Sequence, residues 1–151
     1  MKDLQLSAHF RLSEFTRSAT AQKLGIDNSL DPTRAEHHHL IDSLRTLCSS
    51  VLEPLRQHYH TPIVVTSGYR CPELNRAVGG KEWSQHLKGQ AADIRVPDAA
   101  TGRRWLEWIR THCDFDQLIW ETADKRTFWI HVSFARTSPN RKQYIPYLLK
   151  K

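Results

Sequence analysis

SQHLKGQAAD, the stretch Ser84–Asp93, contains two metal-ligand side chains seven residues apart, His86 and Asp93. Small residues between them leave space around an ion held by the imidazole and the carboxylate. A third candidate ligand, His131, lies downstream in WIHVS, Trp129–Ser133. Two nitrogens and one carboxylate form the ligand set of a catalytic zinc site with an open fourth position. The sequence therefore predicts that His86, Asp93 and His131 bind Zn²⁺, with a hydrolytic water at the open position.

Both blocks fit one longer pattern, Ser-x-His-x-x-Gly-x-Ala-x-Asp followed later by Trp-x-His, and TSGYR, Thr66–Arg70, precedes them. The matching positions are Ser84, His86, Gly89, Ala91, Asp93, Trp129 and His131. This pattern resembles that of the zinc D-Ala-D-Ala carboxypeptidases and L-Ala-D-Glu endopeptidases, whose superfamily includes lysostaphin and the hedgehog amino-terminal domain. The resemblance spans about Phe10 to Phe134 and is specific, because it fixes seven positions in two separated blocks.

The resemblance implies a zinc metallopeptidase that hydrolyses peptide bonds in bacterial peptidoglycan stem peptides. It implies one Zn²⁺ per chain and a metal-activated water with a carboxylate general base. QLIWE, Gln117–Glu121, before Trp-x-His-Val-Ser also resembles the branch found in phage and prophage peptidases. Whether the cut bond is of the D-Ala-D-Ala or the L-Ala-D-Glu type depends on pocket shape, which sequence spacing does not encode.

The general base is where the chain departs from this family. An acid usually stands three residues before the last histidine ligand, and here that position is Phe128. We expect Glu121 to replace it, because a hairpin that pairs Glu121 with Trp129 makes Glu121 and His131 diagonal neighbours on one face. A slip of one residue would turn Glu121 to the other face. Glu82 and Asp124 are the alternatives.

Arg70 and Ser84 are the candidate substrate-binding residues. The family places an arginine just after this strand and turn, and a guanidinium can hold a carbonyl oxygen or a peptide carboxylate. Arg70 could equally be a structural ion-pair partner. Ser84 would bind substrate or fix the nearby ligand. Cys71 is interpreted as an idle thiol.

Composition restricts the remaining possibilities. The chain has 151 residues, 39% hydrophobic and 25% charged, which is typical of one soluble globular domain. Its three cysteines and the lack of an apolar leader favour reduced thiols and synthesis in the cytoplasm, with action on the cell wall after release or export. The net charge of +6 suits an anionic wall. No membrane span is expected, and no nucleic-acid partner, because basic residues are not interleaved with aromatic ones.

The expected fold is α+β: a single domain in which an antiparallel sheet carries the zinc site and helices pack on one side, as in the hedgehog and D-Ala-D-Ala-peptidase folds. A helix is expected to open at Asp31-Pro32 and to kink or end at Pro54. A helix is also expected over 101–112, with strands over 63–66, 92–96, 115–121 and 128–134. The expected parts are an arm over 1–9, the zinc peptidase domain over 10–134 and a carboxyl-terminal tail over 135–151, which is either mobile or folds back through 144–149.

Two other functions fit the sequence. A hedgehog-like binding module would keep the zinc site and lack hydrolysis, as Phe128 suggests, and the discriminating observation is whether Glu121 faces the metal. A basic nucleic-acid-binding domain is the third and weaker hypothesis, because the basic residues are not interleaved with aromatic ones, and steep salt dependence of DNA binding would support it.

Overall fold

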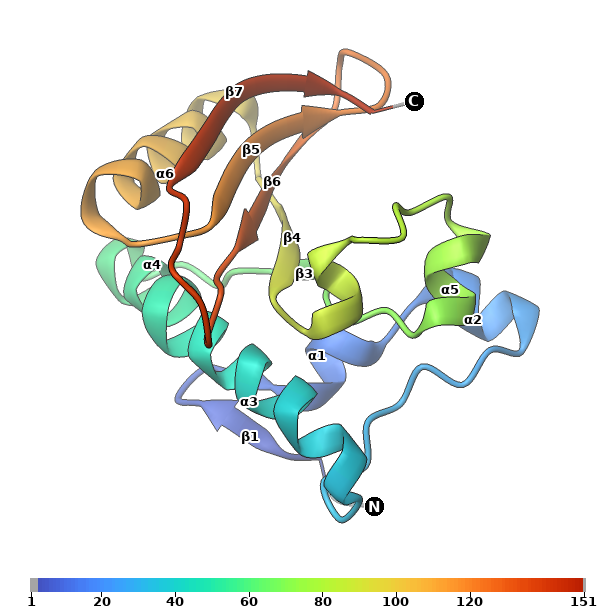
Figure 1. Ribbon diagram of the computed structural model, residues 1–151. Helices are drawn as coiled ribbons and strands as arrows, with labels where there is room; N and C mark the ends of the chain where they lie inside the picture. Colours follow the sequence, from blue (N-terminus) through green and yellow to red (C-terminus); the bar gives the residue numbers. More distant parts are fainter. Residues whose placement is uncertain (1–2, 151) are drawn as a thin grey trace.

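The computed structural model describes residues 3–150 and shows a sheet of five strands with helices against it (Figure 1). Its strands lie in the order β3-β4-β6-β5-β7, and a separate small sheet pairs β1 with β2. The strands are β1 Gln5–Ser7, β2 Phe10–Arg11, β3 Val65–Ser67, β4 Ala91–Arg95, β5 Gln117–Thr122, β6 Phe128–Ser133 and β7 Gln143–Leu149. The helical elements are α1 Leu12–Thr16, α2 Ala19–Leu24, η1 Ala35–His37, α3 His38–Leu47, η2 Cys48–Leu52, α4 Glu53–Tyr59, α5 Pro72–Ala77, η3 Gln85–Lys88 and α6 Ala99–His112.

The two faces of the large sheet have different roles. Side chains alternate along a strand, so Ile94 of β4, Ile130 of β6 and Trp120 of β5 all point into the hydrophobic core. Residues of α3, α4 and α6 complete that core. The neighbours of these strand residues, including Asp93 and His131, point to the opposite face. The predicted α+β class, with helices on one side of the sheet, is therefore confirmed.

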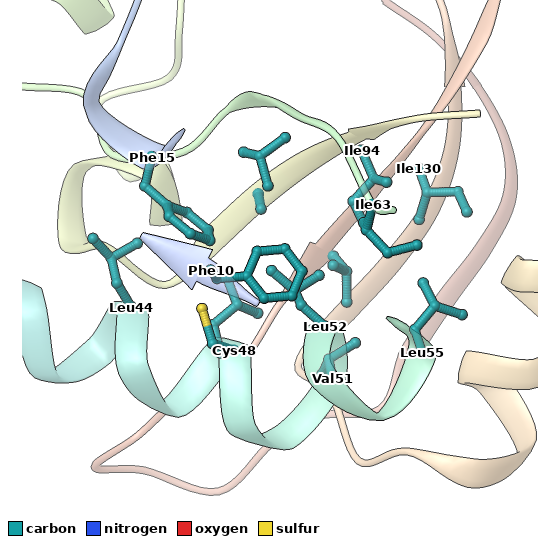
Figure 2. Packing of buried hydrophobic residues seen from close by; sticks show 14 of the residues in the cluster. Phe10, Phe15, Leu44, Cys48, Val51, Leu52, Leu55, Ile63, Ile94 and Ile130 are labelled. Atoms are coloured by element: carbon teal, nitrogen blue, oxygen red, sulfur yellow. The ribbon is translucent and has the colours of Figure 1, made fainter. Parts of the chain in front are cut away.

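The long apolar helix is interrupted near Pro54. Leu44, Leu47, Val51 and Leu55 are fully buried, as their three-to-four spacing predicts, and Figure 2 shows this helix facing the strands of Ile94 and Ile130. The turn over 48–52 is a π-helix, and α4 begins immediately after it. Because proline has no N–H donor, the ordinary helical ladder is broken and a wider turn absorbs the break.

The start of this helix differs from the prediction. Asp31 does not cap a helix, because its carboxylate accepts hydrogen bonds from the backbone N–H and the hydroxyl of Thr33. Such a local turn competes with helix formation. The chain therefore becomes helical only at Ala35, in η1, and α3 begins at His38.

Within residues 3–150, the segments expected to form the arm and the tail each contain a strand. Within the arm, β1 pairs with β2 and Leu6 is buried. Within the tail, β7 pairs in parallel with β5 along the edge of the large sheet (Figure 1). The expectations for Met1, Lys2 and Lys151 concern residues outside those described. None of the helices within residues 3–150 is both long enough and apolar enough to cross a membrane.

Candidate metal centre

The three predicted ligands converge on one buried point. Asp93 Oδ1 lies 3.5 Å from His86 Nε2 and 3.0 Å from His131 Nδ1. The potential ligand atoms of the three residues all lie within 4.8 Å of one another. Residues from two strands and one short turn, 45 positions apart at the extremes (131 minus 86), thus form a cluster of the size that one metal ion requires.

Two of the ligands are fixed by strand register. Asp93 on β4 lies directly opposite His131 on β6. Side chains directly opposite on antiparallel strands have Cβ atoms about 4.5–5.5 Å apart. The sheet therefore brings this carboxylate and this imidazole together, with both side chains on the face away from the core.

His86 comes from the short turn η3 and is oriented by the backbone. The Ser84 hydroxyl accepts a hydrogen bond from the His86 backbone N–H, and Gly89 ends the turn with a φ of 67°. The Nδ1–H of His86 donates to the Gly68 carbonyl at 2.6 Å. A carbonyl can only accept, so Nε2 is the unprotonated nitrogen and it faces Asp93. Metal-bound histidines are commonly oriented by a hydrogen bond of this kind.

The chemistry of the cluster fits a metal ion. His86 Nε2 is buried and has no hydrogen-bond partner within residues 3–150, an arrangement that costs about 1–3 kcal/mol unless a ligand satisfies it. Burial lowers the pKa of His86 and so favours the neutral imidazole. Burial alone would raise the pKa of Asp93, but His86 and His131 hold it well below its usual range. A neutral imidazole and an ionised carboxylate are the forms that bind metal.

Glu121 lies beside this cluster. It pairs with Trp129 in the β5–β6 hairpin, which is the predicted register, and its Oε1 lies 3.6 Å from His131 Nδ1. Its side chain is almost fully buried and borders the cavity at the ligands. The predicted position of Glu121 is thus found, and its role as base stays a prediction.

The two alternative acids are placed differently. The Asp124 carboxylate accepts hydrogen bonds from the backbone N–H groups of Arg126 and Thr127, so it stabilises the hairpin turn. Glu82 is exposed and does not line the cavity. Cys71 also lies outside the cavity lining and caps α5 through its sulfur.

Arg70 touches both the ligand set and the cavity. Its Nη2 lies 3.8 Å from Asp93 Oδ2, and its Nη1 donates to the Asn75 amide oxygen at 3.2 Å. Its side chain is mostly buried, and burial lowers its pKa although Asp93 and Glu121 oppose that shift. The guanidinium therefore holds Asp93 in place and also borders the cavity.

Comparison with known proteins now decides the family. The family described as Peptidase M15 matches residues 8–133. The chain belongs to the peptidase M15 family. This confirms the family predicted from the two motif blocks and makes the chain a metallopeptidase of a zinc-dependent family. No curated protein sequence matches the chain.

The cavity of this M15 chain has walls that the sequence analysis did not identify. It encloses about 490 Å³ at the ligand cluster. Residues from β7 and its end, Leu148, Leu149 and Lys150, form one wall, and Lys150 Nζ lies 3.5 Å from Glu121 Oε2. Trp83 and Arg141 lie on other parts of the lining. In the sequence, the apolar run 144–149 was the feature that could have indicated the wall formed by β7.

Proposed function

We propose that this M15 chain hydrolyses peptide bonds in bacterial peptidoglycan stem peptides, using one Zn²⁺ held by His86, Asp93 and His131. The observation that carries the proposal is that these ligands converge in a cavity that also contains a carboxylate, Glu121. The match to peptidase M15 supports the reaction class. The basic chain, with a net charge of +6, suits an anionic wall.

The proposed reaction gives different roles to Glu121, Arg70 and Ser84. When bound, zinc would supply Lewis-acid activation of the water and of the scissile carbonyl. Glu121 takes a proton from the attacking water and later delivers it to the leaving amine. Arg70 stabilises negative charge on the carbonyl oxygen or holds a carboxylate of the stem peptide. Ser84 keeps the turn of His86 in place and presents its side chain to the cavity.

A zinc-binding module without hydrolysis is the second candidate. Phe128 occupies the position at which members of the resembled family usually carry an acidic residue, and this difference favours the non-hydrolytic binding module. The position of Glu121, 3.6 Å from His131, favours the enzyme.

A digest of purified peptidoglycan by the zinc-loaded chain tests the proposal, with the fragments identified by mass. New amino termini within the stem peptide are the expected result for an endopeptidase, and released D-Ala for a carboxypeptidase. A protein that binds one zinc and releases nothing would instead be the binding module. Zinc content is measured on the same preparation, so that an empty site is not mistaken for an inactive one.

A further inference from the structure

A second hollow adjoins the cavity at the metal ligands. It encloses about 450 Å³, and the two hollows share Trp83, Gln85 and Arg141 in their walls. Each has the size of a typical small-molecule site. A molecule bound at the ligands can therefore continue into the second hollow past these three side chains.

The strand β5 gives the direction of this continuation. Ile119, in the middle of β5, lies directly opposite the ligand His131. Glu121 lies toward one end of the strand, beside Lys150. Gln117 lies at the other end and lines the first cavity, while its neighbour Asp116 lines the second hollow. The second hollow thus opens at the end of β5 away from Glu121.

The lining of the second hollow is rich in hydrogen-bonding groups. Gln85 and Gln90 contribute amides that are joined by a hydrogen bond from Gln85 Nε2 to Gln90 Oε1 at 3.1 Å, and the exposed Thr137 and Ser138 supply hydroxyls. Lys88 adds a positive charge. These groups match a ring that carries hydroxyl and acetamido substituents, and they match an apolar side chain poorly.

Trp83 supplies the flat apolar surface that such a ring also needs. It is 73% exposed, the highest value among the large hydrophobic side chains of residues 3–150, and it borders both hollows. An indole with a free face can pack against the C–H face of a pyranose. Because Trp83 borders both hollows, a ring stacked on it would lie at the end of the second hollow nearest the metal ligands.

At this junction the charge of Arg141 is paired with that of Asp116. The Arg141 guanidinium donates to Asp116 through Nε and Nη2, the latter at 2.7 Å, and the Arg141 backbone N–H also donates to Asp116. Residues 134–141 lie beyond the segment that matches peptidase M15. Part of the second hollow is therefore formed by residues that follow the segment matched by the family.

We propose that the second hollow is a saccharide subsite, in which Trp83 stacks on an amino-sugar ring of the glycan strand while the attached stem peptide reaches the metal ligands. The inference rests on the proposed function, since it names the part of peptidoglycan that lies next to the scissile bond. A sugar bound so close to the ligands places the cut at the sugar-proximal end of the stem, on the side of the L-Ala-D-Glu bond.

Hydrolysis of two matched substrates gives the first test. One is a stem peptide linked to the N-acetylglucosaminyl-N-acetylmuramic acid disaccharide, and the other is the same peptide without the sugars. The wild-type chain should show a KM roughly three- to tenfold lower for the sugar-linked substrate. Trp83→Ala should remove this preference and Trp83→Phe should retain most of it. Leu24→Ala, which truncates another exposed apolar residue outside both hollows, should leave it unchanged.

Binding of the disaccharide alone gives the second test and does not depend on turnover. Calorimetric titration of the zinc-loaded wild type should show binding that Trp83→Ala weakens by a similar factor and Leu24→Ala does not. No binding, or equal binding by the wild type and Trp83→Ala, would overturn the saccharide subsite. If the wild type cuts neither peptide, the proposed function fails, and the titration still decides whether the subsite exists.

Discussion

His86, Asp93 and His131 are held by different means, and each depends on more than its own side chain. The carbonyl of Gly68 fixes the ring of His86, whereas strand register places the other two. Arg70 Nη2 lies 3.8 Å from Oδ2 of Asp93, whereas both histidines lie near Oδ1. At this scale the sequence predicted which three residues the fold brings together, because all three residue types lie in recognisable blocks, and their role as metal ligands stays a prediction. It could not predict Gly68 as an orienting group, because a backbone carbonyl leaves no residue signature.

Removal of a ligand should empty the metal site. His86→Ala, Asp93→Ala and His131→Ala each delete one of three protein ligands, so each should lower zinc affinity by more than the roughly 10- to 100-fold that loss of an orienting partner costs. Metal analysis of the dialysed proteins measures this. His37→Ala is the control, since His37 lies outside the cluster and accepts a hydrogen bond from the Asp31 backbone N–H. Full zinc content in all three variants would show that the metal binds elsewhere.

Replacement of the base should separate binding from catalysis. Glu121→Gln keeps the size of the side chain and loses the proton acceptor, so zinc content should stay normal while kcat falls about 100- to 10,000-fold. Steady-state hydrolysis of a stem peptide measures the effect. Glu82→Gln, at an exposed acid outside the cavity, should retain wild-type rates. Near-normal turnover by Glu121→Gln would assign proton transfer to another group.

At the scale of elements, the hairpin could be predicted and the edge strand could not. The register of β5 and β6 is the predicted one, in which a hairpin turn between the two strands pairs Glu121 with Trp129. The run of β7 contains Pro146, which argues against an interior strand. In the structure β7 is an edge strand. Its register with β5 shifts between Ile119 and Glu121, because β7 has an extra residue in the opposite stretch, which contains Pro146. The pairing of β7 with β5 joins segments that are distant in the sequence, and the local sequence of β7 does not specify its partner.

The turn η3 should tolerate little change at Gly89, the residue that follows it. Gly89 has a φ of 67°, and a Cβ there would lie 2.6 Å from the Leu40 carbonyl oxygen. Gly25 has nearly the same φ, 68°, with nothing within 4 Å of its Cβ position. Both alanine variants bear the left-handed backbone cost of about 1–2 kcal/mol. Gly89→Ala should lose about 1–3 kcal/mol more, because it overpacks against backbone.

Chemical denaturation of both glycine variants measures this difference, and a zinc titration of Gly89→Ala should show weaker binding because η3 carries His86. Equal destabilisation of the two variants would mean that the chain around Leu40 moves freely, and that η3 is less firmly held than its contacts indicate.

At the scale of the molecule, the large sheet separates two functions. One face packs on helices and supplies stability, while the other carries the ligands, Glu121 and the cavity. The sequence predicted a sheet that carries the site and has helices packed on one side, which agrees with this division. It did not predict the cavity walls from Trp83, Arg141 and the end of β7, because these come from loops and an edge that only the complete fold brings to the ligands.

Acid should destabilise the whole fold through Glu53, which joins the amino-terminal hairpin to α4. Its carboxylate accepts hydrogen bonds from the Ser7 hydroxyl and from the His9 backbone N–H, and it lies 2.9 Å from His9 Nδ1. Burial alone would raise the pKa of Glu53, but these contacts outweigh it and lower the pKa. A lowered folded-state pKa gives stability that is present above the ordinary glutamate value of about 4.3 and is lost as pH falls through the folded pKa.

Glu53→Gln should therefore lower the free energy of unfolding by about 1–3 kcal/mol at neutral pH, because the amide replaces charge-assisted hydrogen bonds imperfectly. The difference between wild type and variant should shrink below about pH 4.3, where the carboxylate gains a proton first in the unfolded chain and, at lower pH, in the folded one. Urea unfolding from pH 3 to 7 measures this. Both proteins keep the same metal ligands, so acid release of metal cancels in the comparison. Glu82→Gln should show no such trend, since its side chain is exposed. A difference that stays constant across the range would mean that Glu53 contributes through packing and not through its charge.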